Sequence, residues 1–337
     1  MFFYVRSEPI KRDETLRNMR CPSSAPKNAH PMGVLIFLAK RIGNRRRGNV
    51  TLHPFRGLRV IFISNCTFTR ERKIVFNGET LKMTNKEVLE IALRQSAYDC
   101  NCKPEDLLSD KNVVTISKAD SRARKYVPLP LECDLVSYGN NIVAQTSSRV
   151  KDAVTEYINK YPAYRCFETP NINALNDILA PYNLKVCFMA EYYLPDMNIL
   201  KPLECRYELR VLQKPQLAEL YKDEWGNALT FDDRERDVLA VGAYDNGRLI
   251  GLAGCSADCT EMYQIGVDVL PEFRRQGVAS ALTSKLAIEI IQLGKVPFYC
   301  TAWSNIKSAK NAIKCGFSPA WVELTARDTE FTDNLIK

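Results

Sequence analysis

Apolar and polar residues recur with two different periods along residues 83–337, which predicts a mixture of helices and strands. Apolar positions at helical spacing fall near residues 85–97, 148–159, 171–180, 277–293 and 306–315. Strand-like runs fall near residues 113–117, 133–138, 142–146, 184–193, 207–212, 237–244, 248–256, 261–270, 297–301 and 318–325. The pattern predicts an α/β (α+β) fold built on a mixed sheet.

Two local signals predict how elements begin and turn. Thr84 followed by Glu87 is typical of a capping box at a helix start. Asp245, Asn246 and Gly247 predict a three-residue hairpin turn, with glycine at the position that needs φ > 0. So tight a turn would make the runs on either side antiparallel neighbours.

Residues 1–82 differ from the rest of the chain. They hold 17 Lys and Arg against 5 Asp and Glu, whereas residues 83–337 hold 30 against 34. Apolar patches at 34–39 and 60–64 suggest short strands but have no sustained period. Three interpretations stay open: residues translated from upstream of the true start, a disordered tail, or a nucleic-acid-binding arm. The arm predicts salt-dependent DNA binding that is lost from a chain beginning at Met83.

Composition excludes several kinds of function for residues 83–337. Both histidines, His30 and His53, lie outside this range, so a histidine-based triad, base or metal site is excluded there, and no metal is expected. The slight acidic excess of these residues removes the charge argument for nucleic-acid or membrane binding by them. No apolar run is long enough to span a bilayer. The 12 cysteines are scattered, and no secretory signal precedes them, which predicts reduced thiols in a cytoplasmic protein.

The chain past residue 82 is predicted to form two modules, at 83–203 and 204–337, joined near Pro195 and Pro202. Similar residues recur at an offset of 134, which suggests an internal duplication. The pairs are Cys166 with Cys300, Asn171 with Asn305, Ile172 with Ile306, Cys133 with Val267 and Asp134 with Asp268.

The turn from Arg274 to Ala279 is the main candidate for chemistry. It joins a strand-like run to a helix-like run, where unpaired N–H groups and the helix dipole favour a phosphate. The first module has Gly139 to Ala144 at this point, without a basic residue or a glycine at a helix start, so only the second module is predicted to hold phosphate. The alternative is a capped helix with two solvated arginines.

The neighbourhood of this turn resembles the GNAT superfamily of N-acetyltransferases over about residues 206–330. The resemblance is carried by Val267, Val269, Pro271, Arg274, Gly277, Ala279, Asn305, Ser308, Gly316 and Phe317. It implies a GNAT-like acetyltransferase fold, here preceded by a degenerate, related module. It also implies acetyl-CoA as co-substrate and direct attack of a primary amine on the thioester.

The resemblance implies a set of cofactor contacts. Backbone N–H groups from Arg275 to Ser280 would bind the CoA pyrophosphate, with Gly277 lacking a Cβ where the phosphate approaches. Asn305 and Ser308 would contact the CoA arm, although both also suit a helix cap. The full set of expected contacts is Val267, Val269, Arg274, Arg275, Gln276, Gly277, Val278, Ala279, Ser280, Asn305 and Ser308.

The expected catalytic groups are Glu261, Tyr263 and Val267. The resemblance implies that the Val267 N–H polarises the thioester carbonyl, as part of a strand that pairs with the pantetheine arm. Glu261 would act as base directly or through water, or it is a plain strand-end carboxylate. Gly266 is either a bulge that opens the site or a tolerated strand glycine. The usual tyrosine acid of the family is replaced by Ala312, which leaves water or another donor to protonate the thiolate.

The acceptor side is predicted to include Glu224, Trp225 and Phe231, with Asp232 and Asp233 nearby. The alternatives are core packing for the two aromatic residues and a helix-start charge cluster for the carboxylates. The acceptor would be a small-molecule or peptide amine. The rival function is a non-catalytic CoA-binding or interaction module, which would bind CoA without turning over any amine.

Overall fold

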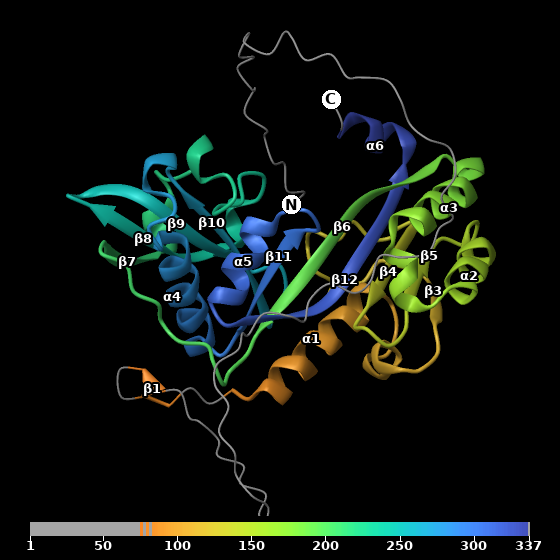
Figure 1. Ribbon diagram of the computed structural model, residues 1–337, viewed down its shortest axis with the longest axis horizontal. Helices are drawn as coiled ribbons and strands as arrows, with labels where there is room; N and C mark the ends of the chain where they lie inside the picture. The colour runs from red at the N-terminus through yellow and green to blue at the C-terminus, as the bar shows by residue number, and fades with distance from the viewer. Residues whose placement is uncertain (1–74, 77–78, 81–82, 336–337) are drawn as a thin grey trace, which may run out of the picture. The chain divides into compact units, whose positions relative to one another are not determined.

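The described part of the chain is built around ten paired strands (Figure 1). The computed structural model describes residues 75–76, 79–80 and 83–335. The ten strands are β3 Val113–Ile116, β4 Cys133–Ser137, β5 Val143–Thr146, β6 Leu184–Pro195, β7 Glu208–Gln213, β8 Asp237–Asp245, β9 Arg248–Ser256, β10 Met262–Val269, β11 Val296–Ala302 and β12 Phe317–Asp328. A separate antiparallel pair is formed by β1 Val75–Phe76 and β2 Glu79–Thr80.

Among the residues that the structure describes, six α-helices accompany the strands. They are α1 Asn85–Asp99, α2 Lys151–Lys160, α3 Thr169–Leu179, α4 Val278–Gln292, α5 Ile306–Lys314 and α6 Thr329–Asn334. Each helix and strand predicted between residues 85 and 325 is present, with ends shifted by a few residues. The short helix α6 was not predicted.

The sheet is mixed, in the order β3-β5-β4-β12-β6-β11-β10-β9-β8-β7. Two neighbouring pairs are parallel, β3 with β5 and β10 with β11, and the others are antiparallel. The mixed α/β fold expected from the sequence is therefore confirmed.

The middle of the sheet interleaves the two predicted modules. Strand β6 pairs along nearly its whole length with β12, from Pro195 opposite Phe317 to Leu184 opposite Asp328. On their other edges β6 pairs with β11 and β12 pairs with β4. Each half of the chain thus contributes a strand to the part of the sheet built by the other half. The boundary near residue 203 stays a prediction.

The offset of 134 residues pairs some unlike elements. Cys166 lies in the 3-10 helix Ala163–Phe167, whereas Cys300 lies on β11. Asn171 and Asn305 do both lie at the beginnings of helices, α3 and α5. The segment from residue 139 leads into β5 and not into a helix, so it offers no helix N-terminus to a phosphate. The duplication itself stays a prediction.

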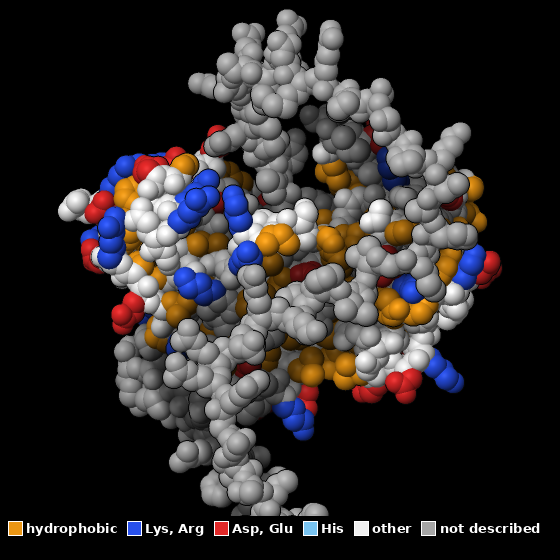
Figure 2. Space-filling model, viewed as in Figure 1, with side chains coloured by type: hydrophobic (Ala, Val, Ile, Leu, Met, Phe, Trp, Pro, Cys, Tyr) orange, Lys and Arg blue, Asp and Glu red, His pale blue; other side chains and the backbone are white. Residues whose placement is uncertain are grey.

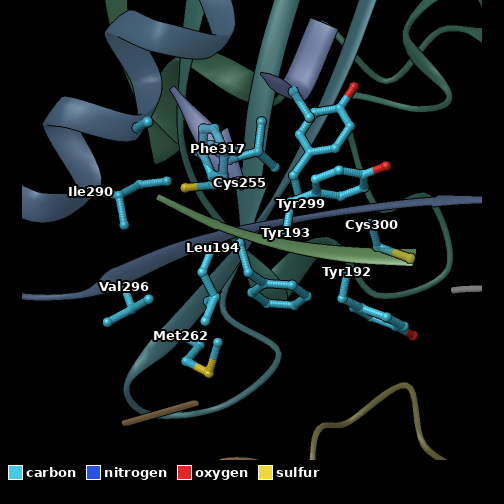
Figure 3. Packing of buried hydrophobic residues seen from close by; sticks show 14 of the residues in the cluster. Tyr192, Tyr193, Leu194, Cys255, Met262, Ile290, Val296, Tyr299, Cys300 and Phe317 are labelled. Atoms are coloured by element: carbon cyan, nitrogen blue, oxygen red, sulfur yellow. The ribbon is translucent and has the colours of Figure 1, made fainter. Parts of the chain in front are cut away.

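Helices cover the two faces of the sheet unevenly. Helices α4 and α5 pack on the face to which Ile265 and Tyr299 point, and α2 and α3 pack on that face farther along. On the other face lie α1 and the segment that follows it up to Leu131. Figure 3 shows Tyr193 and Tyr299 on one side of their strands, with Tyr192 and Cys300 turned to the other side.

Local signals in the sequence explain two of the element ends. The Thr84 hydroxyl accepts the Glu87 N–H at 3.2 Å, and the Glu87 carboxylate accepts the Thr84 N–H at 2.7 Å, as the capping box predicts. The hairpin between β8 and β9 is tighter than predicted, because Asp245 pairs with Arg248 and only two residues form the turn. Asn246 at φ 47° and Gly247 at φ 83° give it type I′ geometry, which matches the strand twist.

Among residues 83–335 no helix is both long enough and apolar enough to cross a membrane. The ten cysteines within the described ranges are all free thiols.

Candidate functional site

A run of unpaired backbone N–H groups marks the turn between β10 and α4. Arg275 has φ 62° and Gly277 has φ 81°, so two of three consecutive residues are left-handed before the helix begins at Val278. The first hydrogen bond of the helix runs from the Ala281 N–H to the Gly277 carbonyl at 3.0 Å. Within the described part of the chain, the six N–H groups from Arg275 to Ser280 have no acceptor. Such a cluster at a helix N-terminus is suited to an anion.

Side chains hold this turn in shape. The Arg274 Nε donates to the Val269 carbonyl at 2.9 Å, which ties the turn to the end of β10. The Gln276 Oε1 accepts from the Tyr207 hydroxyl at 2.6 Å and from the Arg206 guanidinium at 2.8 Å. The backbone donors are therefore arranged before any ligand arrives.

The backbone conformation at position 277 requires glycine, and the space that a side chain would occupy there is open. A Cβ at this position would have the Glu204 carbonyl at 4.0 Å as its nearest neighbour. The positive φ is the reason for glycine, and the absent side chain keeps the approach to the N–H groups open. Arg274 and Arg275 are both exposed beside it. Lys and Arg side chains are spread over the part of the surface that α4 and α5 occupy (Figure 2).

Strands β10 and β11 part after a short stretch of pairing. They are in register only from Met262 opposite Val296 to Gln264 opposite Phe298. Beyond that point β10 continues beside β9 as far as Val269, while β11 continues beside β6 as far as Ala302. On the side that leads to the turn, the facing edges of β10 and β11 are therefore not paired with each other.

Backbone groups of Val267 and Val269 face this parting. The Leu270 N–H donates to the Ile250 carbonyl of β9 at 3.0 Å. Because hydrogen-bonded and non-hydrogen-bonded pairs alternate along an antiparallel ladder, the N–H groups of Val267 and Val269 point away from β9. The same alternation holds at Glu261, whose backbone carbonyl accepts from the Val296 N–H of β11 at 2.9 Å. The N–H groups predicted to contact the pantetheine arm therefore point to the side on which β11 no longer pairs with β10.

The prediction of a bulge at Gly266 is wrong. The β9–β10 ladder runs without a register shift from Gln264 to Val269. A Cβ on Gly266 would lie 1.8 Å from the Asn227 carbonyl oxygen, so glycine is needed because another stretch of backbone crosses the strand there. The parting of β10 from β11 occurs without a bulge in β10.

Glu261 and Tyr263 lie at the closed end of the parting, where the two strands still pair. The Arg94 guanidinium of α1 holds the Glu261 carboxylate through both of its oxygens, with nitrogen–oxygen distances of 2.7 to 3.1 Å. Tyr263 is half-buried and packs against the core on the α4 face. The catalytic roles expected for Glu261, Tyr263 and Val267 stay predictions.

Asn305 and Ser308 make the internal contacts of a helix start. The Asn305 Oδ1 caps α5 by accepting the Ser308 N–H at 3.2 Å. The Ser308 hydroxyl is 2.9 Å from the hydroxyl of Tyr299, the first residue of β11 after its pairing with β10 ends. Ala312, which stands where the tyrosine was expected, is fully buried. Other cofactor candidates, Val278, Ala279 and Ser280, form the first turn of α4.

The three predicted acceptor residues lie in a loop that crosses β9 and β10. Trp225 is 2% exposed and packs with Leu212 and Leu217. This packing agrees with the alternative that Trp225 is a core residue. Glu224 is exposed, and Phe231 is partly exposed with its ring against Tyr221.

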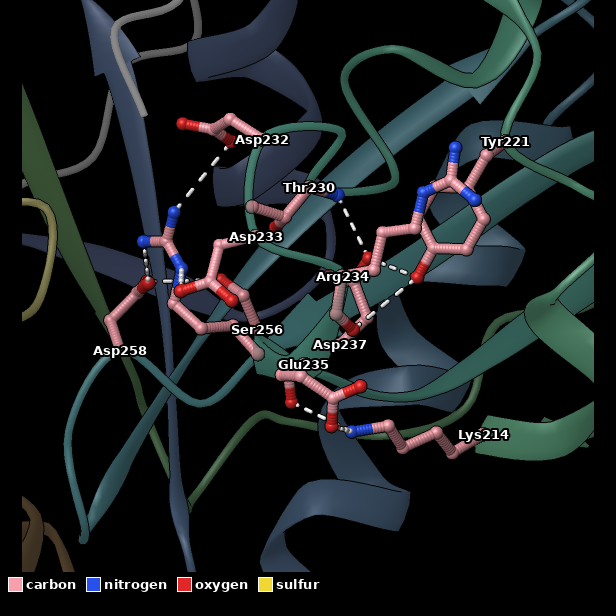
Figure 4. A network of polar contacts seen from close by, with 11 residues as sticks. Lys214, Tyr221, Thr230, Asp232, Asp233, Arg234, Glu235, Asp237, Ser256 and Asp258 are labelled. Atoms are coloured by element: carbon pink, nitrogen blue, oxygen red, sulfur yellow. Dashed lines mark hydrogen bonds and ion pairs between the residues drawn. The ribbon is translucent and has the colours of Figure 1, made fainter.

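The neighbouring carboxylates Asp232 and Asp233 have a structural use. Both pair with Arg236, at 3.7 and 3.1 Å, and Arg236 also pairs with buried Asp258 at 3.0 Å (Figure 4). Asp237 accepts from the Tyr221 hydroxyl at 2.9 Å in the same network. These contacts fasten the loop to the sheet, so the charge cluster is explained by packing.

A cavity that the sequence did not reveal opens on the opposite face of the sheet from α4. We call it the α1-face cavity; its volume is about 50 Å³. Gln264, the last residue of β10 that pairs with β11, lines it together with Cys300 of β11. It therefore reaches the point where the two strands part. The other lining residues used below are Tyr126, Leu131, Tyr192 and Glu323.

Buried charge surrounds this cavity. Arg124 is 2% exposed and pairs with Asp99 at 2.5 Å. Its guanidinium also lies over the rings of Phe298 and Trp321, at 5.3 and 5.2 Å. Burial raises the pKa of Glu323 to about 7, in spite of the opposing charge of Arg124. Burial, with the nearby charge of Glu323, likewise raises the pKa of Asp134.

One signal in the sequence pointed to Glu323. In the last predicted strand, Trp321, Glu323 and Thr325 alternate with apolar residues, which puts a carboxylate on one face of a strand near the middle of the sheet. Carboxylates are rarely buried there without a partner. The partners that make the position informative, Arg124 and Asp99, come from distant segments.

Comparisons with known proteins bear on residues 205–317, which match the family model described as the acetyltransferase (GNAT) family. No curated protein matches the chain. Among solved structures, a putative GNAT-family acetyltransferase from Novosphingobium aromaticivorans is 18% identical, with 43% of this chain and 66% of that one covered and a TM-score of 0.32. A tandem GNAT protein from the clavulanic acid biosynthesis pathway is 13% identical over 48% of this chain and 59% of that one, with a TM-score of 0.33.

An aminoglycoside N-acetyltransferase in complex with CoA is 24% identical over 35% of this chain and 92% of that one, with a TM-score of 0.28. The family model covers the segment that contains β7 to α5, the parting of β10 from β11, and the turn with its free N–H groups. Residues 205–317 form an acetyltransferase domain of the GNAT family.

Proposed function

We propose that this protein transfers the acetyl group of acetyl-CoA to a primary amine. The observation that carries the proposal is the set of six N–H groups from Arg275 to Ser280, which lack an acceptor within the described residues. They lie next to the point where β10 and β11 part. CoA combines an anionic pyrophosphate, which would bind at the turn, with an extended pantetheine arm, which would lie between the strands.

The pyrophosphate would bind the N–H groups of the turn, with Arg274 and Arg275 adding positive charge. The pantetheine arm would run along β10 and use the backbone of Val267 and Val269, in the manner of an added strand. The Val269 carbonyl already accepts from Arg274, so its N–H is the group left for the arm. Asn305 and Ser308 would border the arm from the start of α5.

The reaction would be attack of the neutral amine on the thioester carbonyl. The nitrogen–carbon bond forms, the nitrogen loses a proton to solvent, the carbon–sulfur bond breaks, and the thiolate leaves and takes a proton from solvent. The Val267 N–H would stabilise the oxyanion; losing one such donor typically costs about 10²–10³ in rate. Alignment of the reactants can supply about 7–11 kcal/mol, more than the roughly 3–5 kcal/mol of a general base.

Gly277→Glu tests the cofactor site, because it places a carboxylate against the pyrophosphate. We expect calorimetry to show no acetyl-CoA binding by the folded variant. Gly294→Glu is the matched control: Gly294 has φ 72°, has nothing within 4 Å of a built Cβ, and follows the other end of α4. The Gly294→Glu variant introduces the same charge and the same backbone strain at a site away from the turn, so it should bind acetyl-CoA normally. Unchanged affinity in folded Gly277→Glu would refute the site.

A second candidate is a non-catalytic CoA-binding module. It is favoured by Ala312, which is fully buried where the family's tyrosine acid is expected. Steady formation of acetylated product from a panel of amines supports the enzyme. Binding of CoA with no turnover of any amine supports the module.

A further inference from the structure

The α1-face cavity is lined by a carboxylate and by a polar group that lacks a partner. The carboxylate is that of Glu323, whose pKa is raised by burial and lowered, in opposition, by the Tyr192 hydroxyl and the Trp321 indole as hydrogen-bond donors. The hydroxyl of Tyr126, which also lines it, is buried and has no partner among residues 83–335. Buried polar groups are nearly always satisfied, so an unsatisfied hydroxyl beside a carboxylate in one cavity indicates a polar ligand there.

The balance of buried charge favours a cation as that ligand. Arg124 interacts with the carboxyl groups of Asp99 and Glu323, and the carboxyl group of Asp134 interacts with that of Glu323. Asp99 is paired with Arg124, and the Asp134 carboxylate accepts the Thr325 hydroxyl at 2.7 Å. No described cation pairs with Glu323 or Asp134. Arg327 also lines the cavity, and its guanidinium lies 4.0 Å from the ring of Phe331.

Aromatic rings supply a second attraction for a cation. Tyr192, Trp321 and Tyr138 are stacked, with ring centroids 4.7 and 5.3 Å apart. Tyr192 lines the cavity itself. A carboxylate beside an aromatic wall suits an ammonium group, which gains from both.

The position of the cavity connects it to the proposed reaction. Gln264 and Phe298 form the last pair of β10 and β11, and Gln264 lines the cavity together with Cys300, two residues beyond Phe298. The turn that would hold the phosphates lies at the start of α4, on the opposite face of the sheet. An acetyl group carried between the strands would therefore meet a molecule that enters from the α1 face.

We propose that the α1-face cavity binds the acceptor as a cationic primary amine and that Glu323 is the group that removes the proton from its nitrogen. This inference rests on the proposed acetyltransferase function. Glu323 first takes one proton from the ammonium group and passes it to solvent, which frees the nitrogen lone pair for attack. After the nitrogen–carbon bond has formed, the nitrogen gives a second proton to the Glu323 carboxylate, and the carbon–sulfur bond breaks. The thiolate takes its proton from solvent, so no further reactant is needed.

The shape of the cavity narrows the substrate class. A volume of about 50 Å³ holds only a few water-sized groups, which fits an aminoalkyl end and not a whole ring. The apolar body of the amine would lie at the mouth, near Val127 and Phe188. A carboxylate next to the nitrogen would meet the like charge of Glu323. The preferred substrate is thus a primary alkylamine with an apolar body and no acid group beside the nitrogen.

The protonation of Glu323 supports its role. Its pKa of about 7 allows it to be ionised near neutral pH and still accept a proton. The titratable groups around Glu323 are Arg124, Arg327, Asp99, Asp134, Tyr126, Tyr192 and Cys300. Glu261, by contrast, is held by Arg94 on both oxygens.

The test compares two amines that differ by one carboxylate, 2-phenylethylamine and phenylalanine, on the full chain with acetyl-CoA. Acetylated product is measured by mass spectrometry, and binding of 2-phenylethylamine without acetyl-CoA by calorimetry. We expect at least a tenfold higher kcat/KM for 2-phenylethylamine. Equal rates, or a preference for phenylalanine, would overturn the substrate class.

Glu323→Gln should lower kcat/KM by about 10²–10⁴. It should weaken amine binding about tenfold and leave acetyl-CoA affinity unchanged. Tyr126→Phe removes only an unpartnered hydroxyl, so it should fold and lower kcat/KM about threefold to tenfold. The control is Glu191→Gln, on the neighbouring strand β6 and the opposite face, since Glu191 is in register with Val322. It should leave both readouts unchanged.

The outcomes separate the two proposals. If Glu323→Gln binds and acetylates the amine like the native chain, or if Glu261→Gln alone abolishes turnover, the cavity proposal is overturned while the acetyltransferase stands. If acetyl-CoA does not bind but the amine binds and depends on Glu323, the cavity stands and the acetyltransferase proposal fails.

Discussion

Gly254 of β9 and Gly266 of β10 lie directly opposite each other, and the backbone of residues 227–228 crosses the sheet over both of them. A Cβ on Gly254 would lie 2.1 Å from the Ala228 carbonyl oxygen, and one on Gly266 would lie 1.8 Å from that of Asn227. Asp268 completes the contact by accepting the N–H groups of Asn227 and Ala228 at 2.8 and 2.9 Å. The crossing loop is therefore fixed on β10 just beyond the cavity residue Gln264.

Gly266→Ala should destabilise the fold, because the new methyl group would displace a backbone carbonyl and not a flexible side chain. Overpacking of this kind costs about 1–3 kcal/mol, or more where backbone must move. The free energy of unfolding in urea measures it. Gly226→Ala is the control in the same loop: its Cβ would have one neighbour at 3.4 Å, an ordinary contact. Equal stability of the two variants would contradict the close crossing.

Two arginines two residues apart allow a second prediction. Arg124 is buried and pairs with Asp99, whereas Arg122 is 61% exposed and pairs with Asp120 at 2.6 Å. Arg124→Met leaves Asp99 charged and buried without its partner, which should cost about 3–5 kcal/mol. Arg122→Met breaks a solvent-exposed pair and should leave the stability nearly unchanged. Chemical denaturation of both variants measures the difference, and similar losses would contradict the buried pair.

The turn before α4 should lose affinity when its internal support is removed. Gln276→Leu removes the hydrogen bonds from Tyr207 and Arg206, so the turn would have to be ordered by the ligand. Losing one or two such bonds corresponds to about 1–2 kcal/mol, so acetyl-CoA affinity should fall roughly fivefold to thirtyfold. Gln292→Leu, exposed at the far end of the same helix, is the control. Equal calorimetric affinities would show that the bonds do not preorganise the turn.

The sequence predicts the elements and the phosphate turn because both depend on residues close together in the chain. Thr84 with Glu87 and the apolar period of α4 are local signals, and so is the glycine at 277. The hairpin at Asn246 was predicted one residue too long, since either loop length suits glycine at position 247.

What the sequence does not predict depends on distant contacts. The pairing of β6 with β12 joins residues more than 120 positions apart. The need for glycine at 266 comes from the carbonyl of Asn227, and the environment of Glu323 comes from Arg124 and Asp99. Such contacts carry no periodic signal, so strand order and the α1-face cavity become visible only in three dimensions.

Glu323 should make the stability of the fold depend on pH. Burial raises its pKa from 4.5 to about 7, so between these pH values the folded chain holds a proton that the unfolded chain has lost. The free energy of unfolding should therefore fall as pH rises through this window, by about 3 kcal/mol at most from this group. Glu323→Gln keeps the shape and removes the charge. It should be more stable than the native chain at pH 8 and equal to it near pH 4.

Urea denaturation at pH 4, 6 and 8 measures this dependence. Glu90→Gln on α1 is the control, because Glu90 is exposed and pairs with Lys86 at 3.7 Å; it should change stability by less than about 0.5 kcal/mol at each pH. Parallel pH curves for Glu323→Gln and the native chain would mean that Glu323 titrates as an ordinary surface carboxylate. If Glu323→Gln gains stability and loses turnover, the Glu323 carboxylate destabilises the fold but serves the reaction.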